Sequence, residues 1–335
     1  MLVIGMAYAR SVCLPQAATS APVKGIQLDS RVARFERLLR CEKFVPLEVL
    51  RPFACRMLEE LSRHGRDELL LIMDRTMIND TVNLLYVSVG YHGRALPVGW
   101  LLVPHDGNSS LALQQELLRW VKNCCPAAAP VTIVADREFH SIHLATWLEW
   151  ELSTHFILRI KAGTFVERSG AWIKAGELAE VGWHQQFDGC RVTKDPKTQA
   201  RYTVMSFRDA GEDEPWLLLT NVAEMEKVYE QYGRRFWIEE MFSGHKSRGL
   251  NLEKTRLTDP HRVQRLLVAV TFAYRWLMQI GSEIVNRGWW RQVDNRAATR
   301  TVSLCQIGLR WLRESLLQNT LPPPLTGCFR PLIDT

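Results

Sequence analysis

LLLIMD (residues 69–74) and VTIVAD (residues 131–136) are two short apolar runs, and each ends in an aspartate. Runs of this kind are typical of strands that are buried on both faces of a sheet. In an α/β sheet, functional side chains gather at the carboxyl ends of the strands. If the two strands are neighbours, the carboxylates of Asp74 and Asp136 meet at that edge. For either residue alone, an ordinary strand-end turn is the competing interpretation.

The segments around these runs predict an α/β fold class. Three strands, a helix, a strand, a helix and a strand are expected in that order, at 69–74, 83–93, 95–104, 109–122, 131–136, 141–152 and 155–160. This order is the opening of a ribonuclease H-like fold, in which helices cover a mixed sheet. We therefore assign residues 67–250 to a ribonuclease H-like catalytic core.

The regions outside the strands and helices just named predict an insertion, two helical flanks and a tail. Residues 161–215 contain short alternating segments between turn residues, which indicates an antiparallel β insertion. Residues 1–66 are expected to be helical, and their arginines either bind DNA or are solvated while the helices pack on the core. Residues 251–318 are helical and arginine-rich, and 319–335 form a loose tail because three consecutive prolines cannot continue a helix.

Composition sets broad limits on function. The chain has 335 residues, and 42 Lys and Arg against 36 Asp and Glu give a net charge of +6, which mildly favours an anionic partner. Its eight cysteines form no CxxC pair, which argues against zinc fingers and thioredoxin-like motifs. No apolar run reaches the length of a membrane helix. The apolar residues 1–9 lack a positively charged start, so we expect a cytoplasmic protein with no membrane partner.

A third acid lies on a helix predicted over about 225–246. Tyr232, Arg235, Glu239 and Lys246 fall on one narrow face of such a helix, at about 100° per residue. A phenol, a guanidinium, a carboxylate and an ammonium on one stripe suit a metal-bound phosphodiester. A solvated charged face with internal ion pairs is the alternative. Two-metal phosphoryl transfer needs converging carboxylates, which Asp74 and Asp136 are placed to supply.

YGRRFWIEEMFSGHK (232–246) has the spacing Tyr-x2-Arg-x3-Glu-x6-Lys and resembles the signature of bacterial insertion-sequence transposases of the IS-four type. MDRT (73–76) and ADREF (135–139) look like the first and second aspartate motifs of that family. The resemblance covers roughly residues 30–315. It implies a ribonuclease H-like core with a β insertion between the second aspartate and the glutamate.

The resemblance also implies an activity, cofactors and partners. It implies a DDE-type DNA transposase that excises and transfers an insertion sequence by metal-dependent cut and paste, with a hairpin intermediate. The implied catalytic metal ligands are Asp74, Asp136 and Glu239. They would hold two Mg²⁺ ions, for which Mn²⁺ may substitute. The implied ligands of DNA phosphates are Tyr232, Arg235 and Lys246. We expect a homodimer that binds terminal inverted repeats and target DNA.

Trp216 opens the segment WLLLTN (216–221) and precedes Glu239 by 23 residues. In the family that the chain resembles, a tryptophan at this position stacks on a base flipped out of the transposon end, which offsets part of the cost of extruding that base. A tryptophan packed at the sheet edge is the alternative. These relatives also have a longer amino-terminal DNA-binding region, so residues 1–66 are expected to be truncated relative to them.

Other functions and residues remain open at this point. A ribonuclease H-like nuclease without strand transfer and a non-catalytic DNA-binding remnant are the two alternative functions. Asp80 is a weaker candidate than Asp74 because it lies in a polar stretch, and Glu240 points about 100° away from the signature stripe. Trp289 and Trp290, among several arginines, either contact DNA or pack in the core.

Overall fold

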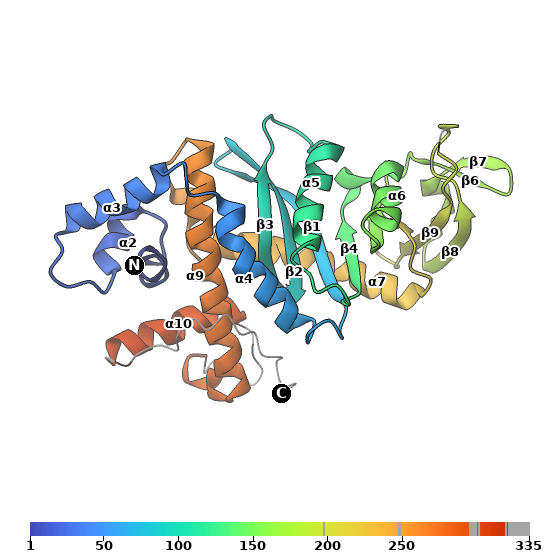
Figure 1. Ribbon diagram of the computed structural model, residues 1–335. Coiled ribbons are helices and arrows are strands. Elements are labelled where there is room, and N and C mark those ends of the chain that lie inside the picture. Colours follow the sequence, from blue (N-terminus) through green and yellow to red (C-terminus); the bar gives the residue numbers. More distant parts are fainter. Residues whose placement is uncertain (197, 247–248, 295–299, 301, 319, 321–335) are drawn as a thin grey trace.

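The computed structural model describes residues 1–196, 198–246, 249–294, 300, 302–318 and 320. An eight-stranded mixed sheet crosses the middle of the molecule, and helices cover both of its faces (Figure 1). Further helices gather beyond one edge of the sheet, and a small hairpin lies near the other. The α/β class expected from the sequence is confirmed.

The sheet has the strand order β3-β2-β1-β4-β5-β10-β9-β8, and β6 and β7 form a separate pair. The strands are β1 (Leu69–Ile78), β2 (Val82–Tyr91), β3 (Arg94–Leu102), β4 (Val131–Ala135), β5 (His155–Arg159), β6 (Phe165–Arg168), β7 (Ala171–Lys174), β8 (Trp183–Cys190), β9 (Tyr202–Arg208) and β10 (Trp216–Thr220). Strands β1, β4 and β5 are parallel, and all other neighbours in the sheet are antiparallel. The first five strands and their two intervening helices follow the order predicted from the sequence.

The helices are α1 (Leu2–Ala9), α2 (Leu14–Ser20), α3 (Leu28–Arg40), α4 (Pro46–Leu61), α5 (Leu111–Lys122), α6 (Ile142–Trp150), α7 (Met225–Gly233), α8 (Trp237–His245), α9 (Pro260–Asn286) and α10 (Leu304–Leu317). Short 3₁₀ turns are η1 (Arg137–Phe139), η2 (Ala175–Leu178), η3 (Arg234–Phe236), η4 (Leu252–Lys254) and η5 (Trp289–Gln292). The side chains of Ser110, Ser141 and Ser303 each accept a backbone N–H at a helix start, which satisfies a donor that has no intrahelical partner. No described helix has the combination of length and hydrophobicity needed to cross a bilayer.

The apolar amino-terminal stretch belongs to the core. It forms α1, and Met6 and Ala7 are buried between α2 and α9. Gly5 permits this packing, because a Cβ on it would lie 2.1 Å from the carbonyl oxygen of Ala17. The long helix α9 is buried over most of its length and contacts α1, α3, α4, α10 and the edge strand β3. The described parts of both flanking regions are mostly helical.

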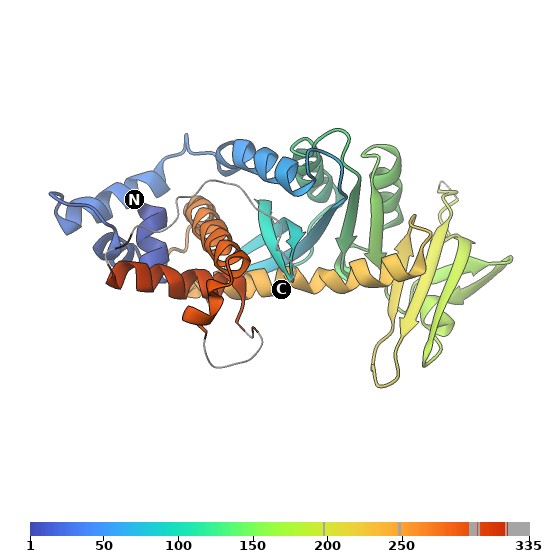
Figure 2. The same cartoon turned by 90° about the horizontal axis from the view of Figure 1, so that it is seen from below.

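The single helix predicted over 225–246 is wrong in detail. The chain forms α7, tightens into the 3₁₀ turn η3, and continues as α8 on the face of the sheet opposite α4, α5 and α6 (Figure 2). A 3₁₀ turn advances about 120° per residue against about 100° in an α-helix. Three residues of η3 therefore rotate the later side chains by about 60° relative to the predicted stripe.

The predicted β insertion is present as antiparallel strands, but its parts are distributed differently. Strands β6 and β7 pair with each other, whereas β8 and β9 extend the main sheet beyond β10. Strand β8 ends at Cys190, and the next residue, Arg191, forms an isolated bridge to Glu167. The tail predicted for 319–335 lies outside the described residues, apart from Thr320.

Candidate active site

Asp74 and Asp136 lie at the same level, directly after the last paired residues of the neighbouring parallel strands β1 and β4. The register between β1 and β4 ends with Met73 opposite Ala135, and each aspartate is the next residue of its strand. The expectation that Asp74 ends its strand is wrong. It lies inside β1, opposite Tyr86 of β2, because antiparallel pairing with β2 carries β1 on to Ile78. The end of the β1–β4 pairing therefore places the two aspartates side by side, although only β4 ends as a strand at this point.

An ion pair joins the two aspartate motifs directly. The Nε of Arg75 donates to both carboxylate oxygens of Glu138, at 2.9 and 3.0 Å, and its Nη1 donates to Asn83 at 3.1 Å. Both charged side chains are about four-fifths buried. Arg75 follows Asp74 and Glu138 lies in the turn η1 after Asp136, so this pair fixes the η1 turn against β1. Neither Arg75 nor Glu138 was predicted as a site residue, although both lie within the two aspartate motifs.

Glu239 reaches the site through Arg235. The Nη2 of Arg235, in η3, donates to Glu239 Oε1 at 2.9 Å, and its Nη1 lies 3.7 Å from Asp74 Oδ2. The Arg235 side chain is only 5% exposed, and its Nε has no partner among the described residues. Burial lowers the pKa of Arg235, but the combined effect of Tyr232 and the three acids is larger and raises it. The guanidinium therefore stays charged. One cation therefore joins two of the three predicted ligands.

Asp136 has its own pair of partners. The hydroxyl of Tyr232 donates to Asp136 Oδ1 at 3.3 Å, and Arg159 Nη1 lies 3.8 Å from the same oxygen. Burial and the charge of Asp136 raise the pKa of Tyr232 to about 12, so the phenol remains a donor. Arg159 was not predicted as a site residue. Its position in the sequence could have indicated this role. Arg159 is the last residue of β5, the parallel neighbour of β4, and Asp136 directly follows β4.

The pKa of Asp74 is raised to about 6. Burial is the main cause, and the charges of Asp136 and Glu239 add to it, while the backbone N–H of Arg75 and the guanidinium of Arg235 oppose it. Because Asp136 and Glu239 both act on the charge of Asp74, the three acids form one electrostatic cluster. Such a cluster favours a bound cation, because a cation relieves both the burial cost and the mutual repulsion.

The donor set of this cluster fits a hard divalent cation. Its members are carboxylates, the ligands that Mg²⁺ prefers in proteins, and the raised pKa of Asp74 reflects mainly the cost of holding a charge in a buried site. The described residues nevertheless contain no group of three His, Cys, Asp or Glu side chains already arranged around a metal position. Glu239 is turned towards Arg235 and would have to leave it to complete a three-acid site.

The remaining predicted residues lie on β10, at the end of α8 and in η5. Trp216 is half-buried at the start of β10, with its ring centroid 4.9 Å from that of Tyr232 and 5.3 Å from that of Tyr229. Lys246 caps the end of α8 and is half-buried, and its backbone N–H donates to Phe242 at 2.8 Å. Trp290 is buried, whereas Trp289 is exposed and stacks on Trp311, which supports a packing role for the former.

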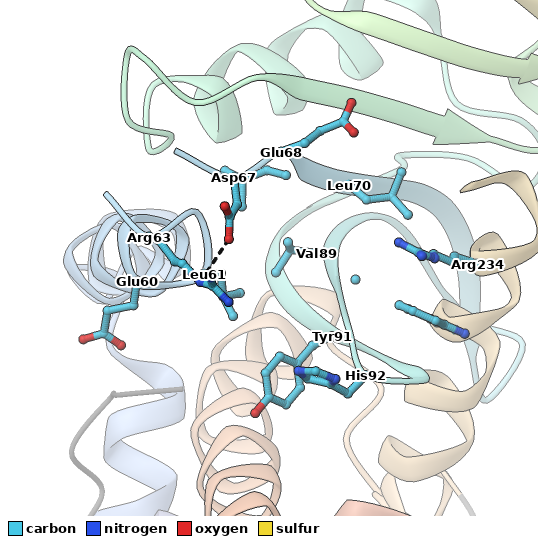
Figure 3. A pocket seen from close by; sticks show the side chains of 13 residues that line it. Glu60, Leu61, Arg63, Asp67, Glu68, Leu70, Val89, Tyr91, His92 and Arg234 are labelled. Carbon is cyan, nitrogen blue, oxygen red and sulfur yellow. Dashed lines mark ion pairs between the residues drawn. The ribbon is translucent and has the colours of Figure 1, made fainter. Parts of the chain in front are cut away.

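A separate cavity of about 410 Å³ lies near the amino-terminal end of β1 (Figure 3). Leu70 and Val89 line it from the sheet, and Arg234 lines it from η3. An ion pair of 3.1 Å between Arg63 and Asp67 borders it. None of the three acids lines this cavity, so the chemistry of the acid cluster belongs to the strand ends and not to this hollow.

Comparison with known proteins supplies a family. Residues 65–276 match the family model described as "Transposase DDE domain". No curated protein matches the sequence significantly. Among solved structures, the chain is similar to the piggyBac transposase in a cryo-EM structure of its synaptic complex with hairpin DNA. That match has 15% identity and a TM-score of 0.40, and covers 96% of this chain and 73% of the other. A TM-score this low does not establish a shared fold.

Proposed function

The chain belongs to the transposase DDE domain family, and from this premise we propose that it is a cut-and-paste DNA transposase of an insertion sequence. We assign it to the IS-four type on the signature at 232–246, with a ribonuclease H-like core. The observation that carries the proposal is the joining of Asp74, Asp136 and Glu239 into one charged cluster, through Arg235 and across two parallel strands.

In this proposal the three acids are the catalytic metal ligands. Asp74 and Asp136 are held by the sheet, and Glu239 is presented by α8. Bound between them, two Mg²⁺ ions, or Mn²⁺ in their place, would activate the attacking oxygen and offset the charge on the leaving oxygen. Asp74 must be ionised to serve as a ligand, and its pKa of about 6 makes this form available at neutral pH.

Arg235 is proposed to exchange partners when DNA binds. Its guanidinium now neutralises Glu239 and Asp74, and a phosphodiester offers it the same bidentate acceptor chemistry. Pairing with a phosphate would release Glu239 to the metal site. DNA binding and completion of the acid cluster would then be one event, which confines the chemistry to the bound substrate.

Tyr232 and Lys246 are proposed to hold the phosphates next to the cleaved bond. The hydroxyl of Tyr232 already lies 3.3 Å from Asp136 and remains protonated, so it can donate to a phosphate oxygen beside that ligand. Lys246, at the end of α8, would contact the backbone farther along. Arg159, at the end of β5, is proposed to position Asp136. It also pairs with Glu214, just before β10, at 3.4 Å, and this contact holds its side chain in place.

Trp216 is proposed to stack on a base extruded from the transposon end. Its partial exposure leaves ring surface for a base, while its contacts with Tyr229 and Tyr232 hold the ring in place. We further propose that the protein works as a homodimer on two terminal inverted repeats, since excision requires both ends to be held together.

The test of this function uses purified protein, a duplex that carries the element end, and Mg²⁺ or Mn²⁺. Wild-type protein should nick the duplex at the end and, given a pre-cleaved end, join it to a target. Asp74→Asn, Asp136→Asn and Glu239→Gln should each abolish both reactions and keep DNA binding. Asp80→Asn, in the exposed β1–β2 turn, is the matched control and should behave as wild type. Nicking without joining would reduce the enzyme to a nuclease, and full activity of one acid variant would remove that residue from the site.

A further inference from the structure

A second cavity, of about 400 Å³, lies between α8, α9 and α10. From α8 it is lined by Glu240 and Ser243, whereas the neighbouring Glu239 belongs to the acid cluster. Tyr274 lines it from α9, and Arg310 lines it from α10. The cavity thus lies beside the helix that carries a catalytic acid, and no step of the proposed reaction uses it.

The lining of this cavity contains two guanidiniums and a helix start. Arg94 pairs with Glu240 at 3.3 Å, and Arg310 pairs with Asp294, which does not line the cavity, at 3.2 Å. Helix α10, of 14 residues, begins here with Ser303 as its cap. The first N–H groups of a helix have no intrahelical acceptor, and the helix dipole adds partial positive charge at that end. Together these features favour an anion.

The hydroxyl of Tyr274 gives an independent indication of a ligand. The side chain is completely buried, and its oxygen has no hydrogen-bond partner within the described part of the chain. The charged groups that act on this hydroxyl include Arg94 and Glu240, and both line the cavity. A buried phenol without a partner is costly. A ligand that presents an acceptor oxygen in the cavity would satisfy it.

We propose that this cavity binds a phosphate group, and that in the working protein this is a backbone phosphodiester of the bound DNA. Arg94, Arg310, the start of α10 and the Tyr274 hydroxyl would donate to its oxygens. The identification of the ligand as DNA rests on the proposed function. Glu240 points about 100° away from Glu239 around α8. Since a helix with its side chains is about 10 Å across, a strand cleaved at Glu239 can reach this adjacent face of α8 within a few nucleotides.

The proposal is tested with Tyr274→Phe and Arg94→Gln, each measured with two probes. Tyr274→Phe removes only a hydroxyl that has no partner, so the fold should be kept. Arg313→Ala is the matched control, because Arg313 is exposed on α10 and does not line the cavity. The first probe is inorganic phosphate, which should raise the Tm of wild type and of Arg313→Ala but raise that of the other two variants much less.

The second probe is duplex DNA titrated at several salt concentrations. Arg94→Gln should reduce the slope of log Kd against log salt by about one, as expected for one lost phosphate contact. Tyr274→Phe should weaken binding without changing that slope. An equal response of all four proteins to phosphate, with unchanged DNA binding in both test variants, would overturn the site.

The two failures can be told apart. If phosphate stabilises wild type through Arg94 and Tyr274 but the protein neither binds nor nicks DNA, the anion site stands and the transposase assignment falls. If DNA is nicked normally while phosphate has no effect on any variant, the transposase stands and the anion site falls.

Discussion

Asparagine in place of Asp74 should stabilise the protein when no divalent metal is added. The aspartate is held in a site that disfavours its charge, because burial outweighs the help of Arg235 and of the Arg75 backbone N–H. Asparagine has nearly the same shape, keeps an oxygen to accept the 2.8 Å hydrogen bond from Arg75 N–H, and carries no charge. The substitution therefore removes the cost and keeps most of the packing.

The size of the effect follows from the pKa. Asp74 titrates at about 6 in the folded protein against an ordinary value of 3.8. A raised folded pKa means that the favourable contribution of the protonated form is present below about pH 4 and is lost as the pH rises through 6. The loss amounts to about 3 kcal/mol of unfolding free energy, at about 1.36 kcal/mol per pKa unit. For a protein of this size that corresponds to roughly 5 °C in Tm.

The assay is thermal unfolding of both proteins between pH 4 and pH 8 with EDTA. The two melting temperatures should agree near pH 4, and Asp74→Asn should become the more stable protein by pH 7. Adding Mg²⁺ at pH 7 should then raise the Tm of wild type by mass action and leave that of the variant nearly unchanged. Asp80→Asn should match wild type throughout.

Two results would refute this reasoning. A difference between the proteins that does not vary with pH would mean that Asp74 is not the titrating group. A variant less stable than wild type at pH 7 in EDTA would mean that Arg235 depends on the charge of Asp74 more than burial opposes it.

Three further predictions concern other residues in and around the candidate site. Arg75→Ala and Glu138→Ala should show a coupling of about 1–2 kcal/mol in a double-mutant cycle by urea unfolding, and additive losses would show that the pair is not a unit. Arg235→Ala should raise Mn²⁺ affinity in calorimetry without DNA, since it frees Glu239, and should lower the salt slope of DNA binding by about one; weaker metal binding would exclude competition. Trp216→Ala should lose about 2 kcal/mol of stability and impair mainly the step that distorts DNA, with partial rescue by a substrate that lacks the extruded base. Equal loss at every step, without rescue, would assign Trp216 to the core alone.

The first five strands and their two helices could be predicted because local pattern and tertiary environment agree there. LLLIMD and VTIVAD are almost entirely apolar before their final aspartates, as is typical of strands covered on both faces, and they form the parallel pair β1 and β4. The length of β1 could not be predicted. Residues 75–78 are held in the strand by antiparallel pairing with β2, and that pairing depends on a partner strand and not on the composition of the segment itself.

The contacts around the acids could not be predicted either, because they join residues far apart in the chain. Arg75 and Glu138 are separated by 63 residues, and Arg159 meets Asp136 only because β5 lies beside β4. Nothing local distinguishes these arginines from the many solvated ones. Their role appears once the strand order is known, since that order brings the ends of three parallel strands together.

The spacing of Arg235 and Glu239 shows a different limit. Residues four apart on a helix lie on one face, and the sequence left open whether Arg235 and Glu239 face a substrate or form an internal ion pair. The same spacing also allows them to pair with each other, and they do so at 2.9 Å. Since η3 rotates the stripe between Tyr232 and α8, Arg235 is buried and lies within reach of Asp74 as well. A shared helix face therefore indicates which groups act together, but whether they meet a ligand or one another depends on burial, which spacing does not encode.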